Sequence, residues 1–119
     1  GAFNGAFYGK DFQASLYSWS FPIQDPHNAT GAVFHTDAGL LNTSAYSNQG
    51  VDQLLNDALA ESNRQERIQR YHEAQELLRT QAPYVFLFHT FTYAIAKNNV
   101  HNVDVFGTGF TNYSKVWKK

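Results

Sequence analysis

Apolar residues recur at helical spacing through the middle of the chain. One such series follows i, i+3, i+4, i+7 and i+8: Val51, Leu54, Leu55, Ala58 and Leu59. Asn48 precedes the series, and its side-chain oxygen can accept a hydrogen bond from an amide of the first turn. The pattern predicts an amphipathic helix that begins just after Asn48.

A second helix is predicted from Asn63 to Pro83. Asn63 and Glu66 have the three-residue spacing of a capping box, and Pro83 cannot continue a helix. The predicted apolar face consists of Ile68, Tyr71, Ala74, Leu77 and Leu78. The charged residues are expected to face water: Arg64, Glu66, Arg67, Arg70, Glu73, Glu76 and Arg79.

The remaining segments give weaker structural signals. Phe3 and Phe7 can share a helical face, and residues 12–19 alternate like a strand. Residues 84–89 form a continuous apolar run that is typical of a strand buried on both faces, and residues 93–97 predict another short strand. Residues 20–49 show no useful period and predict a long irregular loop, which is usually functional or lacks a partner.

Composition excludes several classes of protein. The chain has 119 residues, of which 16% are aromatic, and a formal net charge of −1, so a nucleic-acid partner is not indicated. It has no Cys, which removes disulfides and thiolate chemistry. No apolar run approaches the roughly 20 residues of a membrane span, and no signal peptide is visible at the start. These properties indicate a folded domain without naming an activity.

Candidate catalytic chemistry is sparse. The five histidines form no HExxH pair, and no nucleophile or phosphate-binding motif is present, so no cofactor, resident metal or catalytic residue is predicted. A loop site built from Asp25, His35 and Asp37 around a metal remains the enzyme alternative. The aromatic residues are more informative. Trp19 and Phe21 follow the first predicted strand, where rings can line a ligand site or pack in a core.

Several motifs taken together resemble one family. They are Tyr17-Ser18-Trp19, Asp25-Pro26, the Tyr46-Ser47-Asn48 stretch leading to Val51-Asp52 and Leu54-Leu55, the Arg67, Tyr71, Ala74, Gln75 and Leu78 series, and Gln81-Ala82-Pro83-Tyr84-Val85. This order resembles the C-terminal part of the family 5 extracellular solute-binding proteins, the dipeptide, oligopeptide and nickel-binding receptors of ABC importers. The similarity runs from Lys10 to Lys119.

The resemblance implies an α/β fragment, with mixed helices and strands, of the two-lobed type II periplasmic-binding-protein fold, mainly its second lobe. Residues 1–90 would belong to the second lobe, and residues 91–119 would cross the hinge and return to the first lobe. The residues expected to contact the ligand are Trp19, Ser20, Phe21, Pro22, His35, His89 and Thr90. Pro22 stands where peptide-binding members carry an acidic residue for the peptide's ammonium group, which favours another solute such as a nickel chelate.

The function implied is solute capture without catalysis. The solute would be small and polar, such as a peptide or metal chelate, and the partners would be permease subunits of an ABC importer. The location would be periplasmic or extracellular, with a lipoprotein anchor to the cell surface. Two alternatives stay open: the small metal-dependent enzyme domain, and a fragment that associates with the rest of the receptor chain or with itself and has no binding activity of its own.

Overall fold

The chain divides into two compact units in the computed structural model, which describes residues 1–107 and 109–119. The first unit comprises Gly1–Tyr17 and Asp25–Phe86 and contains the helices. The second unit comprises Ser18–Gln24 and Leu87–Lys119 and contains the short strands. Mixed helices and small antiparallel strands agree with the expected α/β class. Among the described residues, no helix combines the length and apolar character that crossing a bilayer requires.

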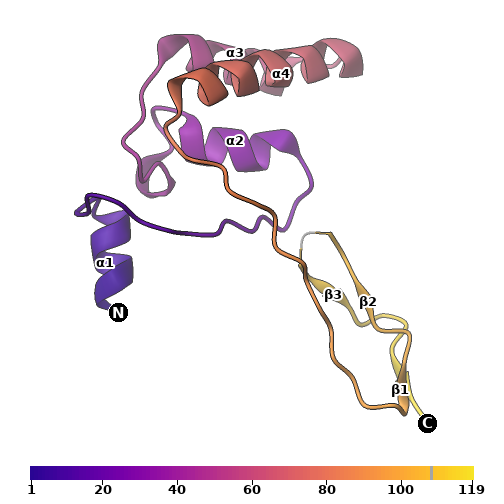
Figure 1. Ribbon diagram of the computed structural model, residues 1–119. Coiled ribbons are helices and arrows are strands. Elements are labelled where there is room, and N and C mark those ends of the chain that lie inside the picture. Colours follow the sequence, from indigo (N-terminus) through magenta and orange to yellow (C-terminus); the bar gives the residue numbers. More distant parts are fainter. Residues whose placement is uncertain (108) are drawn as a thin grey trace. The chain divides into compact units, whose positions relative to one another are not determined.

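The first unit is organised around α2 (Pro26–Phe34), α3 (Gln49–Ala60) and α4 (Arg64–Gln81). Helix α3 packs along α4, and α2 packs against α3 (Figure 1). These three helices contribute most of the buried apolar side chains: Val33, Phe34, Val51, Leu55, Ala58, Tyr71, Ala74 and Leu78. Their packing forms a core that links segments far apart in the sequence. Phe7, in the short helix α1 (Ala2–Tyr8), is also buried.

Both predicted amphipathic helices are confirmed, with their caps. The Asn48 side chain accepts a hydrogen bond from the Val51 amide at 3.0 Å, and the Asn63 side chain accepts from the Gln65 and Glu66 amides. Helix α4 ends at Gln81, and its C-cap residue Ala82 adopts a left-handed conformation (φ 47°) immediately before Pro83. The apolar faces are narrower than predicted: Leu59 is 58% exposed, and Ile68 and Leu77 also reach the surface.

The prediction of a continuous irregular loop over residues 20–49 is wrong, because α2 and the 3₁₀ turn η1 (Gly39–Leu41) lie within it. Asp25 caps α2 by accepting a hydrogen bond from the His27 amide at 2.9 Å. Pro26 occupies the first turn, where the missing amide hydrogen has no cost. The Asp25-Pro26 pair is a helix-start signal that does not depend on apolar periodicity.

The predicted strand over residues 12–19 is also wrong. These residues, all of them described, run without ladder pairing after the short helix α1 (Ala2–Tyr8). The ring of Phe7 stacks on that of Tyr17 at 4.2 Å and on that of Phe3 at 5.8 Å. Ring stacking on α1, rather than hydrogen bonds to a neighbouring strand, therefore holds Tyr17 in place.

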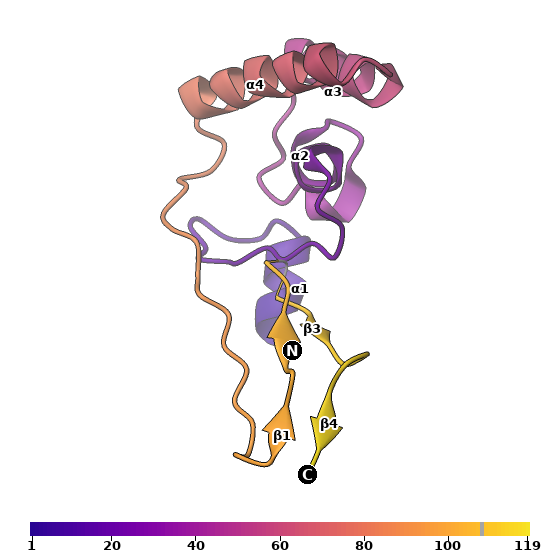
Figure 2. The same ribbon diagram turned by 90° about the vertical axis from the view of Figure 1, so that its right-hand side faces the viewer.

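Two antiparallel strand pairs form in the second unit. Strand β1 (Val100–His101) pairs with β4 (Trp117–Lys118), and β2 (Asp104–Val105) pairs with β3 (Thr111–Asn112), as Figure 2 shows. The strands predicted over residues 84–89 and 93–97 do not form, although every residue in these ranges is described. Their apolar side chains are exposed, Val85 at 79% and Ile95 at 99%, because no neighbouring strand covers them within the described chain.

Candidate functional site

Six of the seven predicted ligand residues lie in the second unit. Trp19, Ser20, Phe21 and Pro22 belong to the segment Ser18–Gln24 (hereafter the ligand segment), and the other two are His89 and Thr90. The rings of Trp19 and Phe21 stack at a centroid separation of 5.9 Å and an angle of 15°. Both residues are half-buried. Such a stacked pair presents an apolar ring surface with little side-chain freedom left to lose.

The ligand segment lies close to the β2–β3 hairpin of its own unit. A Cβ atom placed on Gly109 would lie 3.8 Å from Ser20 Oγ and 3.6 Å from Thr92 Oγ1. Gly109 has a φ of +88°, a conformation that L side chains rarely adopt. The positive φ therefore favours glycine at this turn, and the two distances place Gly109 near two hydroxyl groups of the same unit.

Asp25 follows the ligand segment directly and is held by an arginine of α4. Arg67 Nη2 lies 2.8 and 2.9 Å from the two Asp25 carboxylate oxygens, and its Nε donates to the Ala58 carbonyl at 3.1 Å. The Arg67 guanidinium also stacks over the Tyr71 ring at 5.0 Å. The bonds from Arg67 and from the His27 amide lower the pKa of Asp25 below its usual value.

This ion pair corrects the prediction that Arg67 faces water. The Arg67 side chain is only 27% exposed and touches the ends of α2 and α3 as well as its own helix. Sequence reasoning assigned every charged residue of α4 to the outer face. A useful signal was the position of Arg67 four residues before Tyr71, on the same face of the helix as the buried ring.

His27 lies in the first turn of α2, beside the ion pair between Asp25 and Arg67. Its ring faces Tyr71 at 6.5 Å, and its Nδ1 is buried without a hydrogen-bond partner among the described residues. Burial lowers the pKa of His27, an effect that the nearby Asp25 carboxylate partly offsets. A Cβ atom on Gly31 would come within 2.6 Å of His27 Nε2, so only glycine leaves room for this ring.

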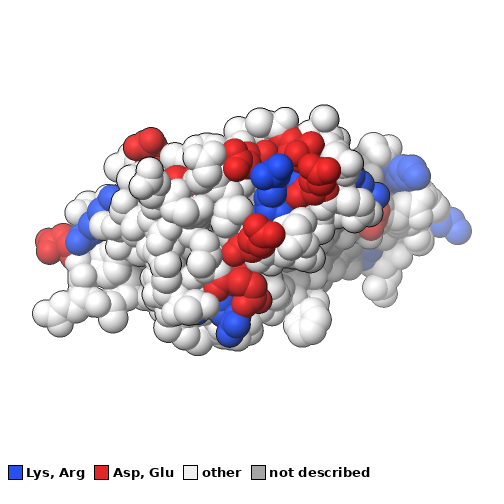
Figure 3. Space-filling view, turned by 90° about the horizontal axis from the view of Figure 1, so that it is seen from above, with Lys and Arg blue, Asp and Glu red and all other residues white. Residues whose placement is uncertain are grey.

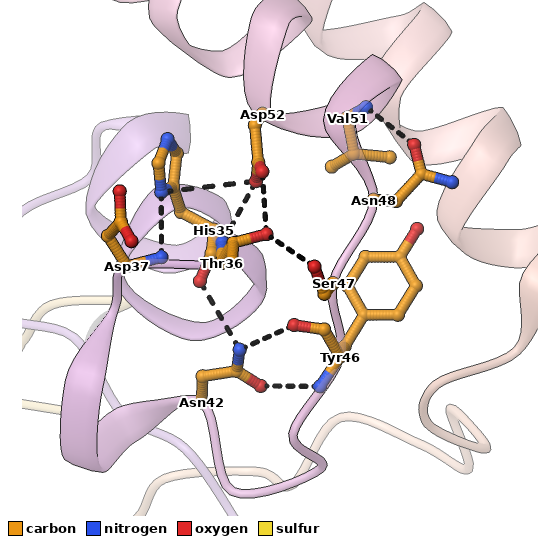
Figure 4. Close-up of polar contacts among 9 residues, drawn as sticks. All are labelled: His35, Thr36, Asp37, Asn42, Tyr46, Ser47, Asn48, Val51 and Asp52. Atoms are coloured by element: carbon orange, nitrogen blue, oxygen red, sulfur yellow. Dashed lines mark hydrogen bonds and ion pairs between the residues drawn. The ribbon is translucent and has the colours of Figure 1, made fainter.

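His35, the seventh predicted residue, lies in the first unit at the end of α2 (Figure 4). Its Nδ1 accepts a hydrogen bond from the Asp37 amide at 3.1 Å and lies 3.9 Å from Asp52 Oδ1. Thr36 ties the same loop to α3, since its amide and hydroxyl both donate to the Asp52 carboxylate, at 2.9 and 2.6 Å. Asp52 lies in the first turn of α3, where a negative charge favours the helix dipole, and it also accepts these two bonds.

A buried asparagine organises the loop between α2 and α3. The side-chain nitrogen of Asn42 donates to the backbone carbonyls of His35 and Tyr46, and its side-chain oxygen accepts a hydrogen bond from the backbone amide of Tyr46 (Figure 4). Asn42 is 2% exposed, so these bonds satisfy a polar group that water does not reach. The contacts around His35 are thus those of a well-ordered loop connection.

The arrangement of the described side chains does not favour the alternative of a metal-dependent enzyme domain. Among the described residues, no three His, Asp or Glu side chains are grouped so as to hold a metal ion. Asp25 is engaged by Arg67, whereas His35 and Asp37 contact each other through a backbone amide. On the α3–α4 side of the molecule, acidic and basic side chains are intermixed (Figure 3), and there Arg70 pairs with Asp57 at 3.6 Å and with Glu61 at 3.2 Å.

Comparison with known proteins gives consistent matches. The chain is 28% identical over 109 residues, 91% of its length, to di/tripeptide-binding protein 1 of Pseudomonas aeruginosa (strain UCBPP-PA14), of which it covers 20%. It is 34% identical over 90 residues, 74% of its length, to the probable D,D-dipeptide-binding periplasmic protein DdpA of Escherichia coli (strain K12), of which it covers 17%.

A third relative has a different named ligand. The chain is 29% identical over 85 residues, 71% of its length, to heme-binding protein A of Haemophilus influenzae (strain ATCC 51907 / DSM 11121 / KW20 / Rd), of which it covers 16%. No protein-family model matches the chain. The chain therefore spans about a fifth of the length of the relatives it matches.

Proposed function

Because the chain belongs to the family 5 extracellular solute-binding proteins, we propose that it is a C-terminal segment of a receptor that captures a small polar solute. Its relatives are named for di/tripeptides, D,D-dipeptides and heme, so a peptide or a metal chelate is the proposed class of solute. The observation that carries the proposal is similarity to these binding proteins over 71–91% of the chain.

The proposed mechanism is closure of two lobes around the solute. Residues 1–90 contribute to the second lobe, and residues 91–119 cross the hinge and return to the first lobe. A solute that contacts both lobes only in the closed form stabilises that form by its differential affinity. The role is binding without catalysis.

The ligand segment supplies the proposed contacts. The stacked rings of Trp19 and Phe21 offer an apolar wall, with Ser20 and Pro22 beside them in the sequence. His89 and Thr90 add polar groups from the same unit, and His35 of the first unit is a separate proposed contact. No carboxylate lies in the ligand segment, which favours a solute that needs no counter-charge for an ammonium group here.

The proposed setting follows from the family. The receptor works outside the cytoplasmic membrane, in the periplasm or as a lipoprotein at the cell surface, and delivers its solute to ABC importer permeases. The enzyme alternative requires metal-dependent turnover. The self-association alternative requires oligomers that form without solute, and the exposed apolar run from Val85 to Ile95 is the surface that favours it.

The test is isothermal titration calorimetry on the complete receptor. The titrants are L-Ala-L-Ala, D-Ala-D-Ala, hemin and a nickel–histidine chelate, with metal-dependent hydrolysis of a dipeptide followed in parallel. Saturable binding of one titrant without turnover supports the proposal. Turnover, or no binding to any of the four, contradicts it.

A further inference from the structure

The two residues that flank the ligand segment are both fixed on helices of the first unit. Tyr17, directly before the segment, stacks on Phe7 at 4.2 Å, and its hydroxyl lies 3.2 Å from the hydroxyl of Tyr8. Asp25, directly after the segment, caps α2 and is bound by Arg67 of α4. The seven residues between these anchors carry four of the proposed solute contacts.

The Asp25 anchor is built more elaborately than a helix cap requires. The His27 amide alone satisfies the cap, yet one guanidinium nitrogen of Arg67 also approaches both carboxylate oxygens. Arg67 is itself restrained by the Ala58 carbonyl and by the hydroxyl and ring of Tyr71. The Nε and Nη2 atoms of one planar guanidinium make these contacts together, whereas the single nitrogen of a lysine ammonium cannot occupy both positions.

We propose that Arg67 is a positioning residue for solute binding, which acts by holding Asp25 and so fixing the backbone at the carboxyl end of the ligand segment. This inference rests on the proposed function. It assigns to α4 a residue that touches no solute but limits the conformations open to Trp19 and Phe21. A segment whose ends are fixed loses less conformational freedom when it binds, and affinity rises accordingly.

Matched variants separate positioning from simple loss of stability. Arg67→Lys keeps the charge but cannot bond to the Ala58 carbonyl and the Asp25 carboxylate from two nitrogen atoms, and Asp25→Asn keeps an oxygen that can cap α2 but loses the ion pair. Arg70→Lys is the control, because Arg70 is also on α4, is also half-buried (33% exposed) and also pairs with carboxylates, but these lie on and just after α3 rather than beside the ligand segment.

The experiment is hydrogen exchange, read by mass spectrometry, on the complete receptor, together with calorimetry using the titrant that binds the wild type best. Arg67→Lys and Asp25→Asn are expected to speed exchange in residues 18–24 and to weaken binding about three- to tenfold. Arg70→Lys is expected to change neither quantity.

The inference is overturned if exchange in residues 18–24 is the same in Arg67→Lys as in Arg70→Lys, whatever the melting temperatures. It is also overturned if exchange rises but affinity stays at the wild-type value. If the wild type binds no titrant, the proposed function fails and the inference about solute binding fails with it, whereas faster exchange would still show that Arg67 anchors the segment.

Discussion

Arg67 and Asp25 are 42 residues apart in the sequence, and their side chains meet with Nη2 2.8 Å from Oδ1. The contact joins the start of α2 to the middle of the first unit, since Arg67 also bonds to the Ala58 carbonyl near the end of α3. Both side chains are partly solvent-accessible, so screening limits the energy of the pair. Its importance is geometric, because Asp25 is where the first unit meets the ligand segment.

Replacing either of two leucines of α3 with alanine is expected to change the free energy of unfolding by very different amounts. Leu55 is fully buried, whereas Leu59 is 58% exposed. Leu55→Ala is expected to lower the free energy of unfolding by about 2–4 kcal/mol, because a cavity is left at a fully buried position of α3. Leu59→Ala is expected to change it by less than about 0.5 kcal/mol. Urea unfolding followed by circular dichroism measures both, and equal losses would contradict the packing described.

The effect of Gly31→Ala on stability is expected to change sign when His27 is replaced by alanine. Gly31→Ala places a methyl group within 2.6 Å of the His27 ring and is expected to cost about 1–3 kcal/mol of stability. In a His27→Ala background, the same change is expected to stabilise α2 by up to about 1 kcal/mol, since alanine is the better helix former.

Gly5→Ala provides the matched control for this pair, because α1 leaves open space at that position. It is expected to be neutral or stabilising. The double-mutant cycle is read from thermal unfolding. A Gly31→Ala penalty that persists without the imidazole would show that backbone strain, rather than the ring, makes glycine necessary at position 31.

The buried imidazole of His27 predicts a dependence of stability on pH. Burial lowers the pKa of His27 below its usual 6.5, so the unfolded chain binds more protons than the folded chain as the pH falls through this range. The free energy of unfolding is therefore expected to decrease below about pH 6.5, by at most about 1.4 kcal/mol per pH unit for one proton.

His27→Gln removes this group and is expected to flatten the pH profile between about pH 6.5 and 5. Urea unfolding at a series of pH values supplies the measurement. A wild-type profile that persists in His27→Gln would assign the pH dependence to other groups.

The cap of α3 predicts a moderate effect. Asn48 accepts a hydrogen bond from the Val51 amide and donates one to Gln81 Oε1 at 2.9 Å. Asn48→Ala is expected to cost about 1–2 kcal/mol, because both bonds are lost. Asn48→Asp keeps the capping oxygen and is expected to recover most of the loss. Thermal unfolding distinguishes the two variants, and equal melting temperatures would rule out a capping role for Asn48.

The sequence predicted the helical part of the fold well, because helix periodicity and caps are local signals. Asn48 and Asn63 marked the starts of α3 and α4, and Pro83 marked the end of α4. The resemblance carried by scattered motifs is confirmed by four relatives that match 71–91% of the chain. Both signals depend on residue identity and spacing, which the sequence contains in full.

The remaining elements depend on contacts between residues far apart in the sequence, which local sequence patterns do not reveal. Residues 84–89 have strand composition, but a strand needs a neighbour, and the described chain offers none to this run. The partnership of Arg67 with Asp25 crosses 42 residues and leaves no periodic trace. The short strands β1–β4 were missed for a related reason, since each is two residues long and is defined only by its partner.

Trp19 is proposed to contact the solute, and calorimetry on the complete receptor measures its contribution to binding. Trp19→Ala is expected to weaken binding of the preferred titrant by roughly ten- to a hundredfold, equivalent to about 1.4–2.8 kcal/mol. The melting temperature without solute is expected to change little. Trp117→Ala, which removes the ring stacked on His101 in the β1–β4 pair, is the control and is expected to leave the affinity unchanged. Unchanged affinity in Trp19→Ala, together with a large fall in melting temperature, would show that Trp19 is a packing residue and does not contact the solute.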